Sequence, residues 1–217
     1  MKLKDTFKLF KYIQNPELNL VVMIMFGISA LITAIPTPGN AFGAYWANYM
    51  FMYFIGQLSV VTISGVVQSS EKFKKLVTKN FAKLLAIGNL INYVIFVVLR
   101  TLIAYKIHTE KYVNGFLIIY MFFQILYVIY AAVINKYMKL GISIMILMLI
   151  FVIYSTFDHG LMEYVEKLGP VADIKVLVVL ATVVSVLTPF LFYGLSLLLY
   201  KKPYNDKMLK RMERNTI

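Results

Sequence analysis

Residues 175–200 read KVLVVLATVVSVLTPFLFYGLSLLLY, and Lys175 is the only charged residue in this run. A helix rises about 1.5 Å per residue, so a helix of this length covers roughly 39 Å, more than the about 30 Å hydrocarbon core of a bilayer. The run therefore predicts a membrane-spanning helix. Thr188 followed by Pro189 predicts a kink within it.

The composition of the whole chain supports the same class of protein. Of the 217 residues, 60% are apolar and 15% are charged, and the mean hydropathy is +0.76. A soluble domain needs more polar surface than these residues supply, whereas a bilayer solvates apolar runs directly. The sequence contains no cysteine, so it offers neither a disulfide nor a thiolate metal site. We predict an all-α polytopic membrane protein.

Six apolar runs are long enough to cross a bilayer, and we predict a single transmembrane domain over residues 1–217. The runs cover about 18–35, 41–67, 84–105, 115–134, 140–157 and 175–200. Pro16 is expected to start the first helix, because proline is tolerated at a first helical position. Three basic segments complete the chain: an in-plane amphipathic helix over 1–15, a cytoplasmic helix over 68–83 and a tail over 201–217.

Basic residues predict the orientation of these runs, because lysine and arginine collect on the cytoplasmic side of short loops. Of the 22 such residues, 17 lie in 1–15, 68–83, 201–217 or the connection between the fourth and fifth runs, and four lie in connections on the opposite side. Both termini are therefore predicted to be cytoplasmic. Despite a net charge of +12, the cations do not form one basic face, so nucleic acid is not an expected partner.

The first predicted cytoplasmic loop, residues 68–83, reads QSSEKFKKLVTKNFAK. Apolar side chains recur at helical spacing while lysines take the remaining positions, so we expect a short amphipathic helix lying across the inner membrane face. Its apolar stripe consists of Phe73, Leu76, Val77, Phe81 and Leu84. Two functions fit this pattern. One is binding of anionic lipid headgroups, and the other is docking of a cytosolic partner.

The first half of this loop contains Ser69, Ser70, Glu71, Lys72, Phe73 and Lys75. A basic helix and two runs precede the loop, and four runs follow it. The arrangement resembles the membrane subunits of ABC transporters of the type-2, exporter-class permeases, in particular the short bacterial forms without a large extracellular domain. In that family the segment between the second and third spans is a coupling helix, which sits in a groove of the ATPase subunit. The resemblance implies coupling roles for Ser70, Glu71, Lys72, Phe73, Lys75, Leu76 and Lys79.

The resemblance also implies partners and a location. A separate ATPase subunit would carry ATP and Mg²⁺, because this chain has no G-x-x-x-x-G-K-[ST] phosphate-binding loop. A second permease subunit, identical or different, would complete the pathway in the bacterial cytoplasmic membrane. The chain itself is not expected to be an enzyme or to hold a cofactor. His108 and His159 fall in connections, where neither catalysis nor a metal site is expected.

Polar side chains inside the runs are candidates for lining a transport pathway, since lipid makes them costly. Asn89, Asn92 and Arg100 share one face of the third run. Asparagines in such positions commonly form interhelical hydrogen bonds. Arg100 lies close enough to the outer end for its side chain to reach the headgroups. Lining of a pathway is the alternative for all three residues.

Aromatic and amide residues form a second candidate stripe. Tyr45, Tyr49, Tyr53 and Gln57 recur every four residues in the second run. In the fourth run, Gln124 lies between Tyr120 and Tyr127. Tyrosines near the end of a span usually belong to the interfacial aromatic belt, whereas Tyr53 and Gln57 lie deeper and need polar partners. These residues either pack within the subunit or line a pathway between two subunits.

Together these features predict an exporter permease for a hydrophobic or amphipathic substrate, namely a peptide, an antibiotic or a lipid. One alternative is the six-span substrate-binding subunit of a vitamin uptake system. Such subunits resemble one another in an A-x-x-x-A pattern on the cytoplasmic half of the first span, whereas here Ala30 and Ala34 lie at its outer end, and Ala82 and Ala86 in the third run. The other alternative is a non-transporting immunity or assembly protein of the membrane.

Overall fold

A computed structural model describes residues 16–32, 44–49, 53, 73–106, 110–134, 136–157 and 173–200. The helices, in chain order, are α2 (Pro16–Ile32), α5 (Phe73–Lys75), η2 (Leu76–Asn80), α6 (Phe81–Asn92), η3 (Tyr93–Val98), α7 (Leu99–Lys106), α8 (Glu110–Ile134), α9 (Met138–Phe157) and α11 (Ile174–Leu199). The segments η2 and η3 are π-helical. Residues 44–49 are also helical. The prediction of an all-α protein is confirmed for the described residues.

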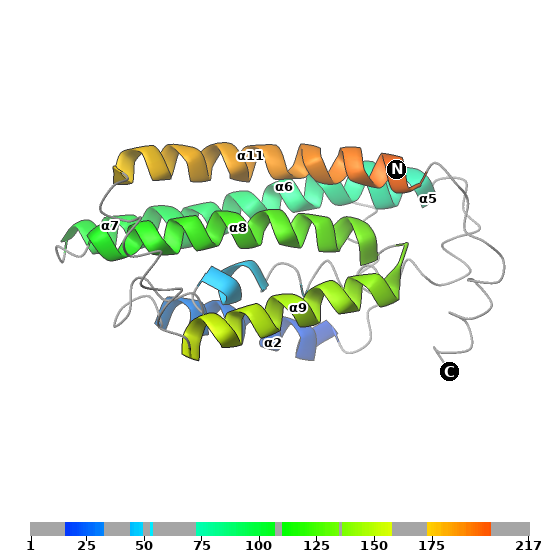
Figure 1. The fold of residues 1–217 in the computed structure, drawn as a ribbon. Helices are drawn as coiled ribbons and strands as arrows, with labels where there is room; N and C mark the ends of the chain where they lie inside the picture. The colour runs from blue at the N-terminus through cyan, green and yellow to red at the C-terminus, as the bar shows by residue number, and fades with distance from the viewer. Residues whose placement is uncertain are drawn as a thin grey trace.

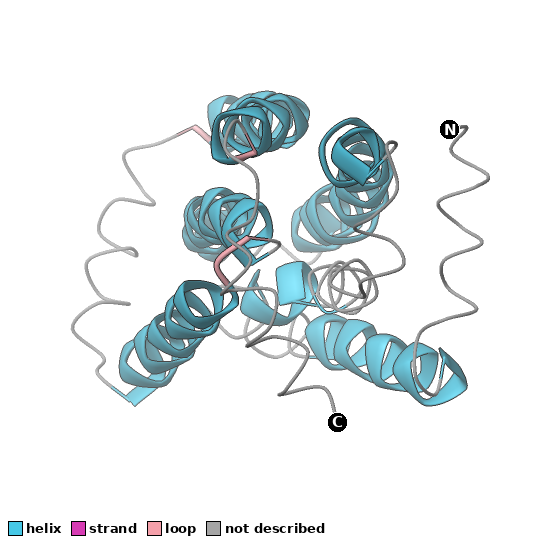
Figure 2. Cartoon of the chain, turned by 90° about the vertical axis from the view of Figure 1, so that its right-hand side faces the viewer, coloured by secondary structure: helices cyan, strands magenta, loops and turns pink. Residues whose placement is uncertain are grey.

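The helices lie side by side in one bundle (Figures 1 and 2). α11 packs against α8 and α6, and α8 also contacts α9. α8 is the central element, because 56% of its apolar stretch is buried, against 33% for α11. The largest buried side chains of α8 are Phe116, Tyr120 and Phe123, each fully enclosed.

Three helices in the described part of the chain are long and apolar enough to cross a membrane: Leu76–Ile103, Val113–Ile134 and Ile174–Leu199. Their outward faces carry large apolar side chains, among them Leu90 and Phe190, which are 63% and 69% exposed. Water would not solvate such a surface, whereas lipid does. The structure therefore fits a helical membrane protein.

These three helices correspond to the third, fourth and sixth predicted runs. α2 and α9 contain shorter apolar helices, Leu20–Ile32 and Lys139–Phe151, within the first and fifth runs. The second run, 41–67, is described only at 44–49 and 53. Six crossings, the in-plane helix over 1–15 and the cytoplasmic placement of both termini remain predictions.

The predicted in-plane helix over 68–83 is wrong for the part that the structure describes. The helix is continuous from residue 73 to 106, so no break separates a cytoplasmic helix from the third run. The apolar stripe explains the difference: Leu76, Val77 and Phe81 are at most 3% exposed, and η2 contacts α11. Side chains enclosed by protein cannot also lie on a bilayer surface.

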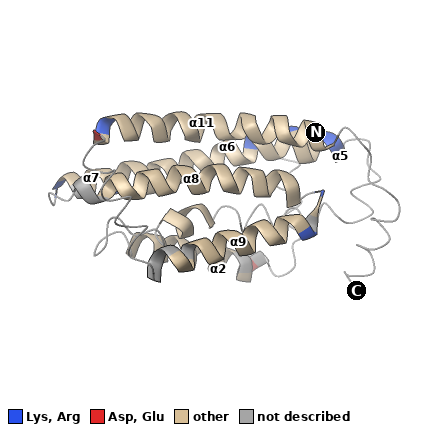
Figure 3. Cartoon of the chain, viewed as in Figure 1, with Lys and Arg blue, Asp and Glu red and all other residues tan. Residues whose placement is uncertain are grey.

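Basic side chains concentrate toward the ends of the helices (Figure 3). At the end that contains α5, the described lysines of the continuous helix are all exposed: Lys74, Lys75, Lys79 and Lys83. Lys139 is an exposed residue in the first turn of α9. Lys74 and Lys75 precede the apolar helix Leu76–Ile103, and Lys79 and Lys83 lie in its first turns, so the cations gather at one end of the helix, as expected near a membrane surface.

Particular residues define where the helices begin and end. α2 begins at Pro16, as predicted. Asp173 caps α11, its carboxylate accepting a hydrogen bond of 2.9 Å from the Lys175 amide. At the other end of α11, Lys136 Nζ donates to the Leu199 carbonyl, where a cation offsets the negative end of the helix dipole. The contact of Lys136, two residues after α8, with Leu199 connects the end of α8 to the end of α11.

Candidate functional site

The centre of the bundle contains a polar cluster around the proline of α11. Pro189 has no amide hydrogen, so the carbonyl of Ser185, four residues earlier, lacks its usual helical donor. Thr188 Oγ1 donates to that carbonyl at 3.2 Å. The threonine hydroxyl therefore replaces the missing amide and limits the cost of placing proline inside a membrane-length helix.

Side chains from two neighbouring helices form hydrogen bonds with α11 beside Pro189. From α6, Asn89 Nδ2 donates to Thr188 Oγ1 at 2.7 Å. From α8, Gln124 Oε1 accepts from Ser185 Oγ at 3.2 Å. All four side chains are at least 92% buried. We call Asn89, Gln124, Ser185 and Thr188 the proline cluster.

Asn92 bonds to a different neighbour. Its Nδ2 donates to the Ala47 carbonyl at 3.0 Å, so it joins α6 to the helical residues 44–49. Asn89 and Asn92 are both buried, so this face of the helix points into protein. Within the described residues, each asparagine forms an interhelical hydrogen bond, the more ordinary of the two functions expected for them.

Arg100 also points into the bundle. Its side chain is 4% exposed, and its guanidinium carbon lies 3.7 Å from the centroid of the Phe116 ring on α8. A guanidinium above an aromatic face gains a cation–π attraction. The expectation that Arg100 extends outward to lipid headgroups is therefore wrong.

The tyrosine stripe packs within the subunit where the structure describes it. Tyr49 meets Phe26 of α2 edge-on, with ring centroids 4.8 Å apart. Tyr53 lies 6.3 Å from the same ring, and Tyr45 lies 5.6 Å from Phe123 of α8. Gln57 is outside the described residues. The aromatic stripe thus joins α2 and α8, while Gln124 faces α11.

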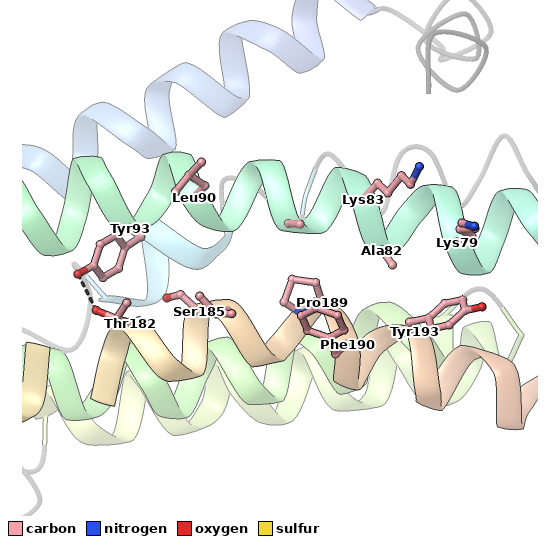
Figure 4. Close-up of a pocket in the computed structure, with 12 residues that line it drawn as sticks. Lys79, Ala82, Lys83, Leu90, Tyr93, Thr182, Ser185, Pro189, Phe190 and Tyr193 are labelled. Carbon is pink, nitrogen blue, oxygen red and sulfur yellow. Dashed lines mark hydrogen bonds between the residues drawn. The ribbon is translucent and has the colours of Figure 1, made fainter. Parts of the chain in front are cut away.

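A groove with a volume of about 620 Å³ lies between α6 and α11, beside the proline cluster. Figure 4 shows Lys79 and Lys83 at one end of it, and Tyr93 and Thr182 at the other. Ser185 belongs both to the groove lining and to the proline cluster. The groove is therefore adjacent to the point where three helices are joined by hydrogen bonds.

The predicted coupling residues divide into three groups. Ser70, Glu71 and Lys72 lie outside the described residues, and Phe73 is the first residue of α5. Leu76 is 3% exposed, so it is enclosed by the subunit and cannot form part of a docking surface. Lys75 and Lys79 are exposed, and they remain available to a partner.

The described residues hold no group of His, Asp and Glu side chains that could bind a metal ion. The chemistry of the proline cluster is hydrogen bonding by neutral groups, which joins helices and positions polar atoms in an apolar interior. The sequence pattern identified Asn89 and Gln124, but it gave Thr188 no role beyond a kink and Ser185 no role. The signal was present, because a serine four residues before a proline has an unsatisfied carbonyl, and the threonine between them can supply a donor.

No family model, curated protein or solved structure matches this chain.

Proposed function

We propose that the chain is the transmembrane subunit of an ABC exporter, which moves a hydrophobic or amphipathic substrate out of the cell with energy from a separate ATPase subunit. The observation that carries the proposal is the continuous helix over residues 73–106, whose first turns are basic and exposed on one side and buried on the other. Such a helix can receive a force outside the membrane and transmit it into the bundle.

The dimensions of this helix support that role. Residues 84–103 contain Arg100 as their only charged residue, and they cover about 30 Å, which equals the hydrocarbon core of a bilayer. Residues 73–83 then extend roughly 15 Å further. Lys75 is exposed on this extension, where a cytosolic subunit can contact it.

The buried side of the extension supports transmission. Val77 and Phe81 are at most 1% exposed, so this part of the helix is packed into the subunit and moves with it. Further along the same helix, Asn89 bonds to α11 and Asn92 bonds to Ala47. Displacement of the basic end therefore acts on two neighbouring segments. α11 can bend at its proline, where one backbone hydrogen bond is missing.

The test is reconstitution with an ABC ATPase subunit whose gene lies next to the gene for this chain; the proposal requires such a gene. We expect the two proteins to co-purify and the complex to hydrolyse ATP faster than the ATPase alone. Lys75→Glu should weaken the complex by about tenfold, equivalent to ~1.4 kcal/mol. The matched control is Lys139→Glu, the same charge reversal on an exposed lysine of α9.

Two outcomes would overturn the proposal. One is a wild-type chain that neither binds nor stimulates the ATPase when both are folded. The other is an equal loss of binding in both variants, which would indicate general electrostatic attraction rather than a coupling surface. Tight binding of a vitamin by the isolated chain would favour the uptake alternative, and a stable complex with a non-ATPase membrane partner would favour an immunity or assembly function.

A further inference from the structure

The groove between α6 and α11 has apolar walls. Leu90 comes from α6, and Val186 and Phe190 come from α11. Ala82 and Ala86, one turn apart on α6, also line it, and their small side chains leave the space open. Its volume of about 620 Å³ lies within the range of roughly 300–1,000 Å³ that is typical of small-molecule sites.

The groove opens away from the bundle. Leu90, Val186 and Phe190 are 63%, 57% and 69% exposed. These residues belong to helices of membrane-crossing length, so the open side faces the hydrocarbon chains of lipid. An apolar ligand can therefore enter sideways from the bilayer.

One end of the groove is positively charged. Lys79 and Lys83 lie there, one turn apart on the same face of the helix, and Tyr193 of α11 lies at the same end (Figure 4). Both lysines are exposed. Lysine and tyrosine side chains are the common anchors at the level of lipid headgroups. An anionic headgroup is the complementary chemistry at this end.

The other end of the groove stops at a hydrogen bond. The hydroxyl groups of Tyr93 and Thr182 lie 2.7 Å apart, joining the two walls. Ten residues separate Lys83 from Tyr93, a distance of about 15 Å along the helix. That distance is half of the about 30 Å hydrocarbon core, so the groove extends from the headgroups to the middle of the membrane.

We propose that this groove binds one acyl chain of an anionic phospholipid, whose phosphate lies at Lys79 and Lys83. The length of the groove favours a lipid over a second copy of the chain, because a transmembrane helix would need a groove that crosses the whole membrane. The charged end favours an anionic headgroup over a zwitterionic one. This proposal is independent of the exporter proposal and can hold if that one fails.

The test is a titration of the purified chain with dioleoylphosphatidylglycerol and with dioleoylphosphatidylcholine, followed by native mass spectrometry. The wild type should bind one phosphatidylglycerol molecule about twenty-five-fold more tightly than phosphatidylcholine, since each of the two lysines near an anionic headgroup contributes about fivefold. Replacing both Lys79 and Lys83 by Gln should abolish the preference. The matched control replaces Lys74 and Lys75 by Gln, which removes the same charge from exposed positions outside the groove.

A second variant tests the acyl-chain part of the proposal. Ala86→Phe fills the groove and leaves both lysines, so it should weaken binding of both lipids. The proposal is overturned if Ala86→Phe has no effect, because the lipid would then bind by its headgroup alone. It is also overturned if the control pair of lysines matters equally, or if Ala86→Phe dissociates a dimer without changing lipid binding. Unchanged thermal unfolding of each variant in detergent shows that the chain remains folded.

Discussion

The hydroxyl of Thr188 is the most informative group to remove. Thr188→Val keeps the branched shape but deletes both the acceptor for Asn89 Nδ2 at 2.7 Å and the donor to the Ser185 carbonyl at 3.2 Å. An interhelical hydrogen bond in a membrane protein contributes about 0.6 kcal/mol on average and at most about 1.7. A buried polar atom left without a partner costs about 1–3 kcal/mol. We expect Thr188→Val to lower the free energy of unfolding by about 1–3 kcal/mol.

A double-mutant cycle isolates the interhelical part of this loss. Reversible unfolding in mixed detergent micelles, titrated with sodium dodecyl sulfate, would measure Thr188→Val, Asn89→Leu and the combination. The coupling energy should lie between about 0.6 and 1.7 kcal/mol. Asn89→Leu combined with Thr182→Val is the control. Thr182 bonds to Tyr93 and to the Val178 carbonyl instead, so its coupling to Asn89 should be below about 0.5 kcal/mol.

The role of the hydroxyl beside the proline has its own test. Pro189→Ala supplies the amide that the Ser185 carbonyl lacks, so Thr188→Val should cost about 0.5–1.5 kcal/mol less in that background. A cost that is the same in both backgrounds, together with zero coupling to Asn89, would refute the reasoning that Thr188 joins the two helices and replaces the missing donor.

Two further predictions concern other contacts of the bundle. A Cβ added at Gly141 of α9 would lie 2.9 Å from the Cβ of Ile134, so Gly141→Ala should lower the free energy of unfolding by about 1–3 kcal/mol in the same assay. Gly194→Ala is the control, because open space surrounds that position, and it should be neutral or stabilising. Equal effects of the two substitutions would contradict the close approach of Gly141 to Ile134. A double-mutant cycle of Arg100→Gln and Phe116→Leu should give a coupling energy of about 0.5–2 kcal/mol. If the two losses of unfolding free energy were additive, the 3.7 Å contact between the guanidinium and the ring would contribute nothing to stability.

Several features of the candidate site could be predicted from the sequence. Asn89, Asn92 and Arg100 were expected on one face of the third run, and all three are at most 5% exposed. This prediction needed only helical spacing and the high cost of polar groups in lipid. The direction of Arg100 could not be obtained in this way, because its distance from the membrane surface allowed both an outward and an inward rotamer. Contact with Phe116 on α8 decided between them.

The arrangement of the segment before the third run could not be predicted from the sequence. Its alternation of lysines and apolar residues is compatible with a helix on a membrane surface and with the first turns of a longer helix packed against α11. Sequence spacing is identical in the two arrangements. Burial of Leu76, Val77 and Phe81 by neighbouring elements distinguishes them, and that burial depends on residues distant in the chain.

The amino-acid sequence by itself determined the class of the protein and the length of its apolar helices, because hydrophobicity and backbone hydrogen bonding within a helix are local properties of a run of residues. The tertiary structure alone decided which polar groups meet. Asn89 and Thr188 are 99 residues apart and form a hydrogen bond of 2.7 Å only because α6 and α11 have one particular rotation and offset. The groove beside them has the same origin, since its two walls come from those same helices, and neither wall forms a groove without the other.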